Sequence, residues 1–462
     1  MSRSGASWDG LRLRRAAAAA LQAGLAAADP GRLVRRQLDV RGARVRVAGV
    51  EHRSGSGRLV LIAAGKAAPA MAGAAVQLLG ERLSDALAVT NAAGPPLART
   101  RLLVAGHPLP DERGRAAADA ITALAQGLSR KDLLLILLSG GASALLPAPV
   151  PGVGLADKAE LTSLLLRAGA TIHELNTVRK HLSRLKGGGL ARAAAPARVV
   201  CLALSDVVGD DLSTIASGPT VPDPTTYAAA LRVLEGRGVL ERCPAAVRAH
   251  LAAGARGELP ETPKPGDPLF RHVTTRVIGS NRLSVEAAAR EARRLGLRSR
   301  ILTTRLEGEA REVARVLVAV LRECVEAGRP ARPPVCLLAG GETTVTLRGD
   351  GQGGRNQELA VAAAQPLSDF PVPAVLASLA TDGIDGTSDA AGGVVDAESV
   401  RRAEALGVAP PAAFLAGSDS RGFLAALGDL ILTGPTGTNV MDLTLLLAAH
   451  SRKKHVISGA GL

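Results

Sequence analysis

Aromatic side chains are nearly missing from this 462-residue chain. They make up 1% of it, and one tryptophan, Trp8, and one tyrosine, Tyr227, are the only members of their kinds. Because single-stranded nucleic acid is commonly bound by stacking its bases on aromatic rings, this scarcity argues against such a function. The interior must instead be built from alanine, leucine and valine. The length and the 47% apolar composition predict a globular protein of two or three domains.

Disulfide and zinc patterns are also missing. The four cysteines, at positions 201, 243, 324 and 336, form no Cys-x-x-Cys pair and have no histidines at zinc-binding spacing. We therefore expect a reducing, cytoplasmic location. No apolar run approaches the roughly 20 residues of a spanning helix, so no membrane segment is expected. The arginine-rich start is compatible with a transit peptide, but the helical spacing of its leucines and alanines after Asp9 favours a first amphipathic helix.

Acidic residues are outnumbered, with 42 aspartates and glutamates against 56 lysines and arginines, a net charge of +14. A basic protein can bind nucleic acid, but here the arginines are scattered in ones and twos along the chain, so we expect no nucleic-acid partner. A positive field also attracts small anions. Anionic small molecules are therefore the expected ligands.

Strands and helices alternate along the first half of the chain. The six aliphatic residues 133–138 predict a strand buried on both faces, and residues 58–64 and 198–204 are similar. Helices are expected over 67–79, 112–128, 155–167 and 172–185. This alternation predicts an α/β fold with a Rossmann-like, doubly wound parallel sheet.

A second, smaller α/β domain is expected after the proline-rich run 259–268. Strands are predicted over 273–278, 299–302, 335–339 and 374–380, and the alternating residues 343–348 predict a half-exposed strand. The expected domains are therefore residues 9–258 and 270–455.

Three polar turns follow three buried strands at the carboxyl ends, where parallel sheets bind ligands. A lysine at a helix start can present its ammonium to a phosphate, and a glycine turn can receive an anion through backbone N–H groups. Clustered aspartates repel one another unless a cation relieves them, which favours magnesium. The alternatives are a solvated lysine and a turn that only relieves crowding. The turns are Gly65-Lys66, Ser139 to Ser143, and Ser205 to Asp211.

Three further features have weaker signals. Asn176, Arg179 and Lys180 can share one helix face ahead of Lys186, although most such faces are simply solvated. His107 sits in a Gly-Pro turn, where a structural role is as plausible as a catalytic one. Residues 349–354 contain Gly-x-Gly-x-x-Gly, but the preceding segment looks like part of a hairpin and no well-placed acidic residue follows about 20 positions on, which argues against a dinucleotide.

Seven stretches together resemble the class II glycerate 2-kinases, whose C-terminal part is called the MOFRL domain. They are Gly65 to Ala68, Leu138 to Leu146, Asn176 to Gly189, Ser205 to Asp223, Leu338 to Glu358, Thr381 to Gly392 and Thr433 to Asp442. The resemblance covers nearly the whole chain and implies a MOFRL region over about 333–445. It also implies transfer of the ATP γ-phosphoryl group to the 2-hydroxyl of D-glycerate, with magnesium. The sequence leaves the oligomeric state open between a monomer and a homodimer.

The same resemblance implies that Lys66 and Arg355 are catalytic, and we add Asp206 as a third catalytic residue. Asp206, Asp210 or Asp382 would hold magnesium or accept the 2-hydroxyl proton. The expected substrate and nucleotide contacts are Gly65, Ser139, Gly140, Gly141, Ser143, Asn176, Arg179, Lys186, Glu342, Asn356, Asp382 and Asn439. The chain departs from the family pattern at Ser418-Asp419-Ser420-Arg421, where relatives tend to carry a Tyr or His.

Two rival functions stay open at this point. One is an NAD(P)H-dependent hydroxypyruvate reductase, whose substrate differs from glycerate only in oxidation state. The other is a non-catalytic module that binds sugar acids or nucleotides, because Rossmann-like folds do not dictate chemistry.

Overall fold

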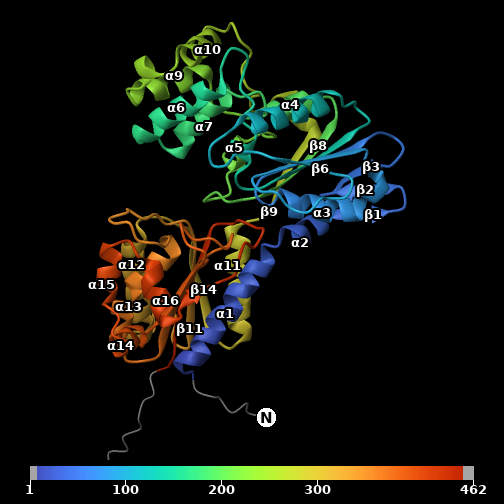
Figure 1. Cartoon of the computed structure of the whole chain (residues 1–462). Coiled ribbons are helices and arrows are strands. Elements are labelled where there is room, and N and C mark those ends of the chain that lie inside the picture. Colours follow the sequence, from blue (N-terminus) through green and yellow to red (C-terminus); the bar gives the residue numbers. More distant parts are fainter. Residues whose placement is uncertain (1–7, 451–462) are drawn as a thin grey trace, which may run out of the picture. The chain divides into compact units, whose positions relative to one another are not determined.

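The computed structural model describes residues 8–450, which form two compact units (Figure 1). The first unit contains Asp29–Ser280 and Gly437–Asn439. The second contains Asn281–Thr436 and the described parts of Met1–Ala28 and Val440–Leu462. No helix among residues 8–450 is long and apolar enough to cross a membrane.

The first unit is built on a sheet of six parallel strands in the order β6-β5-β4-β7-β8-β9. The strands are β4 (Leu59–Ala64), β5 (Asp85–Thr90), β6 (Arg101–Val104), β7 (Leu133–Leu138), β8 (Arg198–Leu204) and β9 (Val273–Gly279). The chain builds outward from β4 to β6, then returns beside β4 and builds in the opposite direction. This doubly wound arrangement confirms the predicted fold and places its switch point between β4 and β7.

Helices cover both faces of this sheet. Two helices and a small antiparallel sheet of three strands pack on one face: α2 (Pro30–Arg35), α3 (Ala68–Leu79), β1 (Leu38–Arg41), β2 (Arg44–Val47) and β3 (Val50–Arg53). The other face carries α4 (Glu112–Gln126), α5 (Ala142–Leu145) and α8 (Gly189–Ala194). A separate core joins α6 (Leu155–Arg167), α7 (Ile172–His181), α9 (Tyr227–Gly236) and α10 (Ala245–Ala255).

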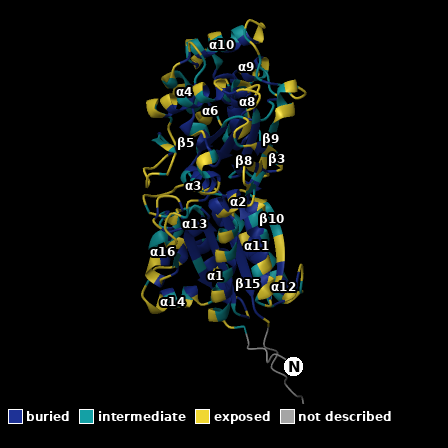
Figure 2. Ribbon diagram, turned by 90° about the vertical axis from the view of Figure 1, so that its right-hand side faces the viewer, coloured by how far each residue is buried: buried dark blue, intermediate teal, exposed yellow. Residues whose placement is uncertain are grey.

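The second unit has a mixed sheet in the order β10-β11-β15-β12-β13-β14. Its strands are β10 (Arg298–Leu306), β11 (Val335–Gly341), β12 (Ala374–Ala380), β13 (Gly392–Asp396), β14 (Leu430–Ile431) and β15 (Asp442–Ala448). On one face lie α1 (Gly10–Ala27) and α11 (Asn281–Arg294); on the other lie α12 (Ala310–Glu326), α13 (Arg355–Ser368), α14 (Ser399–Ala405), α15 (Pro411–Ala416) and α16 (Ser420–Leu427). Figure 2 shows the buried interior of each unit in dark blue.

The division into units differs from the expected domains 9–258 and 270–455. Helix α1 begins at the Asp9 cap as predicted, but its apolar face packs on β12 and β15 of the second unit. Strand β9 was expected to open the second domain, yet its backbone pairs with β8 as the sixth strand of the first sheet. The chain therefore leaves the first unit at Ser280, not in the proline-rich run.

Two local predictions were wrong. Residues 343–348 form no strand; Thr344 makes an isolated bridge with Glu309, and the N–H of Thr346 donates to the Glu309 carboxylate at 2.8 Å. Helix α7 ends at His181 instead of 185, because the next residues turn to a different partner: the N–H of Arg184 donates to the carbonyl of Ala148 at 2.9 Å.

Candidate functional site

Two turns join at the switch point of the first sheet, after β4 and β7. The N–H of Lys66 donates to the carbonyl of Gly140 at 2.9 Å, and the N–H of Ala67 donates to the hydroxyl of Ser139 at 3.0 Å. Gly65 has φ +127°, and a Cβ there would lie 2.2 Å from the Ser139 Oγ. Only glycine fits this backbone and this approach. The two predicted turns are therefore one platform, in which the buried Ser139 is a structural link.

Lys66 runs along this platform beside Gly141. Its Cγ lies 3.5 Å from where a Cβ of residue 141 would be, and the ring of His107 lies 3.0 Å from the same point. Burial lowers the pKa of His107, and the charge of Lys66 lowers it further. At neutral pH His107 is therefore an uncharged imidazole next to an ammonium. The positive charge at this turn belongs to Lys66.

Asp206, which follows β8, reaches the same platform. Its Oδ2 lies 2.2 Å from the position that a Cβ of Gly140 would take, and the amide nitrogen of Asn439 lies 3.4 Å from that position. The structure thus brings together five of the predicted site residues, which are Lys66, Gly140, Gly141, Asp206 and Asn439. In this unit a cation and a carboxylate flank a glycine turn at the carboxyl ends of parallel strands, the place where such sheets bind ligands.

The contact at Gly140 gives a first testable prediction. Gly140→Ala puts a methyl group where the Asp206 carboxylate lies, so Asp206 must move, while the backbone at 140 is not left-handed and tolerates alanine. We expect turnover to fall by about tenfold to a hundredfold, since misplaced catalytic groups cost that much, with little loss of melting temperature. Gly73→Ala in α3 is the matched control, because only Leu97 at 3.6 Å faces its added methyl group. Equal turnover in the two variants would contradict the role of Asp206.

Of the other aspartates after β8, Asp211 is stabilised by hydroxyl groups of the protein. The Asp211 carboxylate accepts hydrogen bonds from the hydroxyls of Thr214 and Ser213, both at 2.7 Å. Burial acts to raise the pKa of Asp211, but these hydroxyl donors outweigh it and the pKa is lowered. Asp210 is half-buried with φ +59°. Within residues 8–450 no group of three or more His, Cys, Asp or Glu side chains could hold a metal ion.

The residues around α5 and α7 that were predicted to contact substrates differ in whether they already have partners in the protein. Ser143, Asn176 and Lys186 are tied into the protein: Ser217 bonds Ser143 Oγ at 2.9 Å and Asn176 Oδ1 at 3.0 Å, and Lys186 Nζ donates to the Ser143 carbonyl at 2.8 Å. Burial lowers the pKa of Lys186. Arg179 is different, because its half-buried guanidinium has no hydrogen bond or ion pair with any described residue. It is a cation without a protein partner.

Arg355, the first residue of α13, lies in a second cluster, in the other unit. Its Nε and Nη2 donate to the two oxygens of Asp442 at 2.5 and 2.9 Å, and its Nη1 lies 3.1 Å from Glu342. Asn281 donates to the carbonyls of Val440 and Asp442 at 3.0 and 2.8 Å, which fixes the start of β15. Burial raises the pKa of Asp442 to about 7, although Arg355 acts to lower it.

The helix that carries Arg355 is capped by Asp385. This buried carboxylate accepts the N–H groups of Asn356 and Gln357 at 3.1 and 2.9 Å and both of their side-chain amides at 3.1 Å. The predicted contact residue Asn356 is thus part of the cap. Asp382, a predicted metal ligand, lies in the turn after β12, where its Oδ1 accepts the N–H of Ile384 at 3.2 Å.

The glycine loop ahead of α13 is packed against protein. A Cβ at Gly349 would lie 2.6 Å from the Gly417 carbonyl, one at Gly351 2.5 Å from the Asp419 side chain, and one at Gly354 2.4 Å from Asp385. Residues 418–421, where the sequence differs from the family pattern, therefore pack against this glycine loop. Because Asp385 already occupies the N–H groups of the helix, the loop offers no pyrophosphate site and the dinucleotide interpretation fails.

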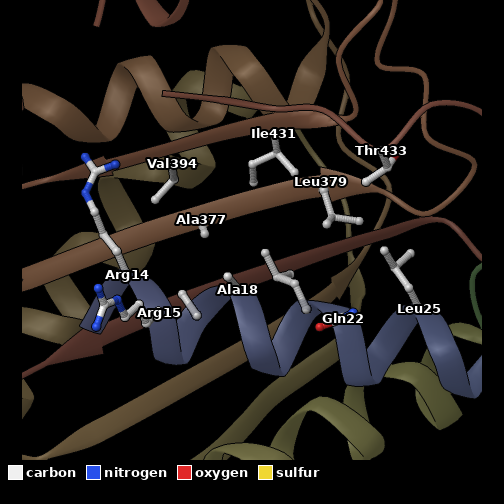
Figure 3. Close-up of a pocket in the computed structure, with 12 residues that line it drawn as sticks. Arg14, Arg15, Ala18, Gln22, Leu25, Ala377, Leu379, Val394, Ile431 and Thr433 are labelled. Carbon is white, nitrogen blue, oxygen red and sulfur yellow. The ribbon is translucent and has the colours of Figure 1, made fainter. Parts of the chain in front are cut away.

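The second unit also contains a cavity that lies away from Arg355 and the other predicted site residues. It has a volume of about 520 Å³ and lies beside α1 (Figure 3). Its lining is largely apolar, with Leu25, Leu379, Val394 and Ile431, and contains none of the predicted site residues.

The chain is similar to known proteins over most of its length. Residues 16–252 match a domain of unknown function, DUF4147, and residues 335–442 match the MOFRL family, so the chain is a two-domain α/β protein of that class. A glycerate 2-kinase of Pyrococcus horikoshii is 43% identical over 92% of this chain and 95% of its own. The crystal structure of a glycerate kinase from Thermotoga maritima, 38% identical, covers 94% of this chain and 99% of its own with a TM-score of 0.84.

The chain belongs to the class II glycerate 2-kinase family, as its sequence motifs indicated. One relative, from Agrobacterium vitis, carries a provisional hydroxypyruvate reductase name and is 43% identical over 85% of this chain and 87% of its own.

Proposed function

We propose that this protein is a glycerate 2-kinase, which transfers the γ-phosphoryl group of ATP to the 2-hydroxyl of D-glycerate and yields 2-phosphoglycerate. The observation that carries the proposal is the position of Lys66 and Asp206 around the Gly140-Gly141 turn, at the switch point of a doubly wound sheet. Family membership adds a second, independent support.

Phosphoryl transfer needs positioning and charge neutralisation more than covalent chemistry from the protein. Lys66 and Arg355 are the proposed catalytic cations, which bind the oxygens of the transferring group. Asp206 is the proposed base that accepts the proton of the 2-hydroxyl, and the N–H groups of the Gly140-Gly141 turn bind a substrate anion. Arg179, whose guanidinium has no partner among residues 8–450, is the proposed site for the glycerate carboxylate.

Several residues predicted to contact substrates are better assigned to positioning. They are buried and already bonded inside the protein: Ser139, Asn176, Lys186 and Asn356, with the half-buried Ser143. Their side chains hold the two platforms in place, so we propose that substitutions there act through geometry. Glu342 and Asp442 position Arg355 in the same way.

Magnesium would be bound jointly by carboxylates of this chain and by the phosphates of the nucleotide. Mg²⁺ is usually held by one or two carboxylates together with substrate phosphates and waters, and not by a cage of protein ligands. The described residues offer that kind of donor set, since they contain single carboxylates near the site and no cluster of three. Asp206 or Asp210 would bind the ion in the first unit and Asp382 would do so in the second. The ion would neutralise phosphate charge.

The decisive experiment is to incubate the protein with D-glycerate and MgATP and to identify the product by phosphorus and carbon NMR. We expect ADP and 2-phosphoglycerate. A parallel reaction with hydroxypyruvate and NADH tests the reductase alternative, and we expect no NADH oxidation, because the glycine loop lacks a pyrophosphate site. NADH oxidation without ADP release would overturn the proposal, and activity in neither assay would favour a binding module.

A further inference from the structure

A cavity lined by several basic side chains lies in the first unit, with a volume of about 460 Å³. Parts of α4, α7, α8, α9 and α10 and the segment 259–263 line it. The lining contains four basic side chains and no carboxylate: Lys180, Arg184, Lys186 and Arg192. The lining contains the positioning residue Lys186, but none of the four side chains proposed to act on the substrates, which are Lys66, Arg179, Asp206 and Arg355. The cavity is thus a separate, positively charged site.

Carboxylates outside the cavity pair with only some of the basic side chains that line it. Lys180 pairs with Asp223 at 3.4 Å, and Arg184 pairs with Asp119. Lys186 and Arg192 have backbone carbonyls as their partners, with the Arg192 Nη2 donating to the Glu261 carbonyl at 2.5 Å. Because burial lowers the pKa of Lys186, Arg192 is the cation that borders the cavity without a carboxylate partner among the described residues, and an anion would be attracted to it.

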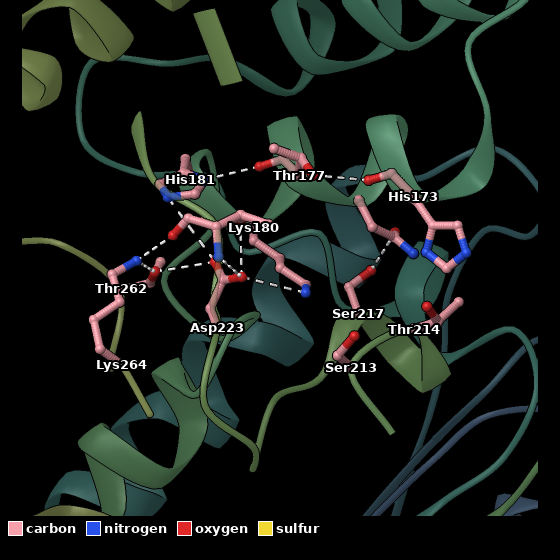
Figure 4. A network of polar contacts seen from close by, with 12 residues as sticks. His173, Thr177, Lys180, His181, Ser213, Thr214, Ser217, Asp223, Thr262 and Lys264 are labelled. Atoms are coloured by element: carbon pink, nitrogen blue, oxygen red, sulfur yellow. Dashed lines mark hydrogen bonds and ion pairs between the residues drawn. The ribbon is translucent and has the colours of Figure 1, made fainter. Parts of the chain in front are cut away.

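The wall of the cavity is a pre-formed hydrogen-bond network (Figure 4). The Asp223 carboxylate accepts from Lys180 and from the hydroxyls of Thr225 and Thr262, at 2.7 and 3.0 Å. The Nδ1 of His181 bonds the Thr177 carbonyl at 2.8 Å, while its Nε2 lies 3.2 Å from Glu261. Since nearly every polar group of this wall is satisfied, a ligand would meet a rigid surface.

The floor of the cavity is apolar and contains the single tyrosine of the chain. The ring of Tyr227 packs against His181 and His250, with centroid distances of 4.7 and 5.7 Å. Leu259 and Pro260 line the same space. Apolar surface with a few convergent polar groups is the usual composition of a small-molecule site, and about 460 Å³ lies within the size range of such sites.

We propose that this cavity binds a small organic anion, with its carboxylate or phosphate group on Arg192 and Arg184 and its apolar body on Tyr227 and Leu259. The site is distinct from the phosphoryl-transfer site, so a ligand there is an effector and not a substrate. Arginine suits this task because its planar guanidinium binds a carboxylate or a phosphate through two parallel hydrogen bonds.

Isothermal titration calorimetry with phenyl phosphate as the probe tests the proposal. We expect saturable binding that persists in excess MgATP and D-glycerate, and that weakens at least about tenfold in Arg192→Gln, which removes the charge of an exposed side chain. Arg232→Gln is the matched control: Arg232 is also exposed, on α9, but does not line the cavity. Its affinity for the probe should equal that of the original chain.

Benzoate and phenol complete the test, since benzoate carries a carboxylate head and phenol carries no charge. Binding of phenyl phosphate or benzoate, but not of phenol, supports an anion site. Three results would overturn the proposal: no binding of either anion, full affinity in Arg192→Gln with unchanged melting temperature, or displacement of the probe by MgATP.

Discussion

Arg355→Lys is expected to lower kcat on the order of a thousandfold, with KM for glycerate and ATP changed only a few-fold, because an arginine that stabilises the transferring phosphoryl group is worth that much or more. The guanidinium already uses its Nε and Nη2 on Asp442. Its Nη1 lies 3.1 Å from the exposed Glu342, and a phosphate oxygen would have to replace or share that pairing. A lysine has one ammonium on a flexible chain and cannot both satisfy the buried Asp442 and reach a substrate in a fixed orientation.

A matched variant separates catalysis from stability. Arg311 also forms a buried ion pair with α13, at 2.8 Å from Glu358, with side chains 10% and 3% exposed. Arg311→Lys should therefore lower the melting temperature about as much as Arg355→Lys and leave kcat within a few-fold. Steady-state kinetics and thermal unfolding of both variants decide the matter. If Arg355→Lys loses stability but keeps its turnover, the Arg355–Asp442 pair is structural only.

The first unit could be predicted well because its signals are local. Strands β4, β7 and β8 are continuous aliphatic runs buried at nearly every position, and each ends in small or polar residues. Their predicted limits agree with the structure to within one residue. The meeting of the turns after these strands was predictable for the same reason, since parallel strands place the residues that follow them at one edge of the sheet.

In the second unit the predicted strands 299–302, 335–339 and 374–380 are present as β10, β11 and β12, but their partners could not be predicted, because the sheet is held by non-local pairs. Strand β15 follows a long loop and inserts between β11 and β12, pairing antiparallel with both. Helix α1 packs on this sheet although nearly the whole first unit separates them in the sequence. No local pattern encodes such partners, which is why α1 and β9 were assigned to the wrong halves.

The site shows the same limit. Asp442 and Asp385 were not predicted as site residues. Asp442 forms an ion pair with Arg355, and Asp385 caps the helix that Arg355 begins. A signal for Asp442 existed: it stands directly before the apolar run 443–449, as Lys66 and Asp206 stand directly after such runs. Its partner, however, is 87 residues away in sequence, and only the fold brings the two together.

Lys66→Met is expected to abolish nearly all turnover, again on the order of a thousandfold, because methionine keeps the length and shape of the side chain and removes its charge. Lys66→Arg should recover only part of the loss, since the larger guanidinium must pass Gly141 and His107, which lie against the lysine stem. The control is Lys264→Met in the same unit. Lys264 bonds Thr262 at 2.8 Å and Glu261 at 2.9 Å, so its loss should affect stability and leave kcat unchanged.

The titration of His107 reports independently on whether the platform survives in Lys66→Met. Burial and the Lys66 charge both lower the pKa of His107, so removing the charge should raise that pKa while burial keeps it below its ordinary value. Proton NMR of the histidine ring, assigned with His107→Gln, measures this shift. A raised His107 pKa together with a large loss of kcat locates the defect in the missing ammonium. A raised pKa with kcat within a few-fold of the original would show that Lys66 lies beside the reacting groups without acting on them.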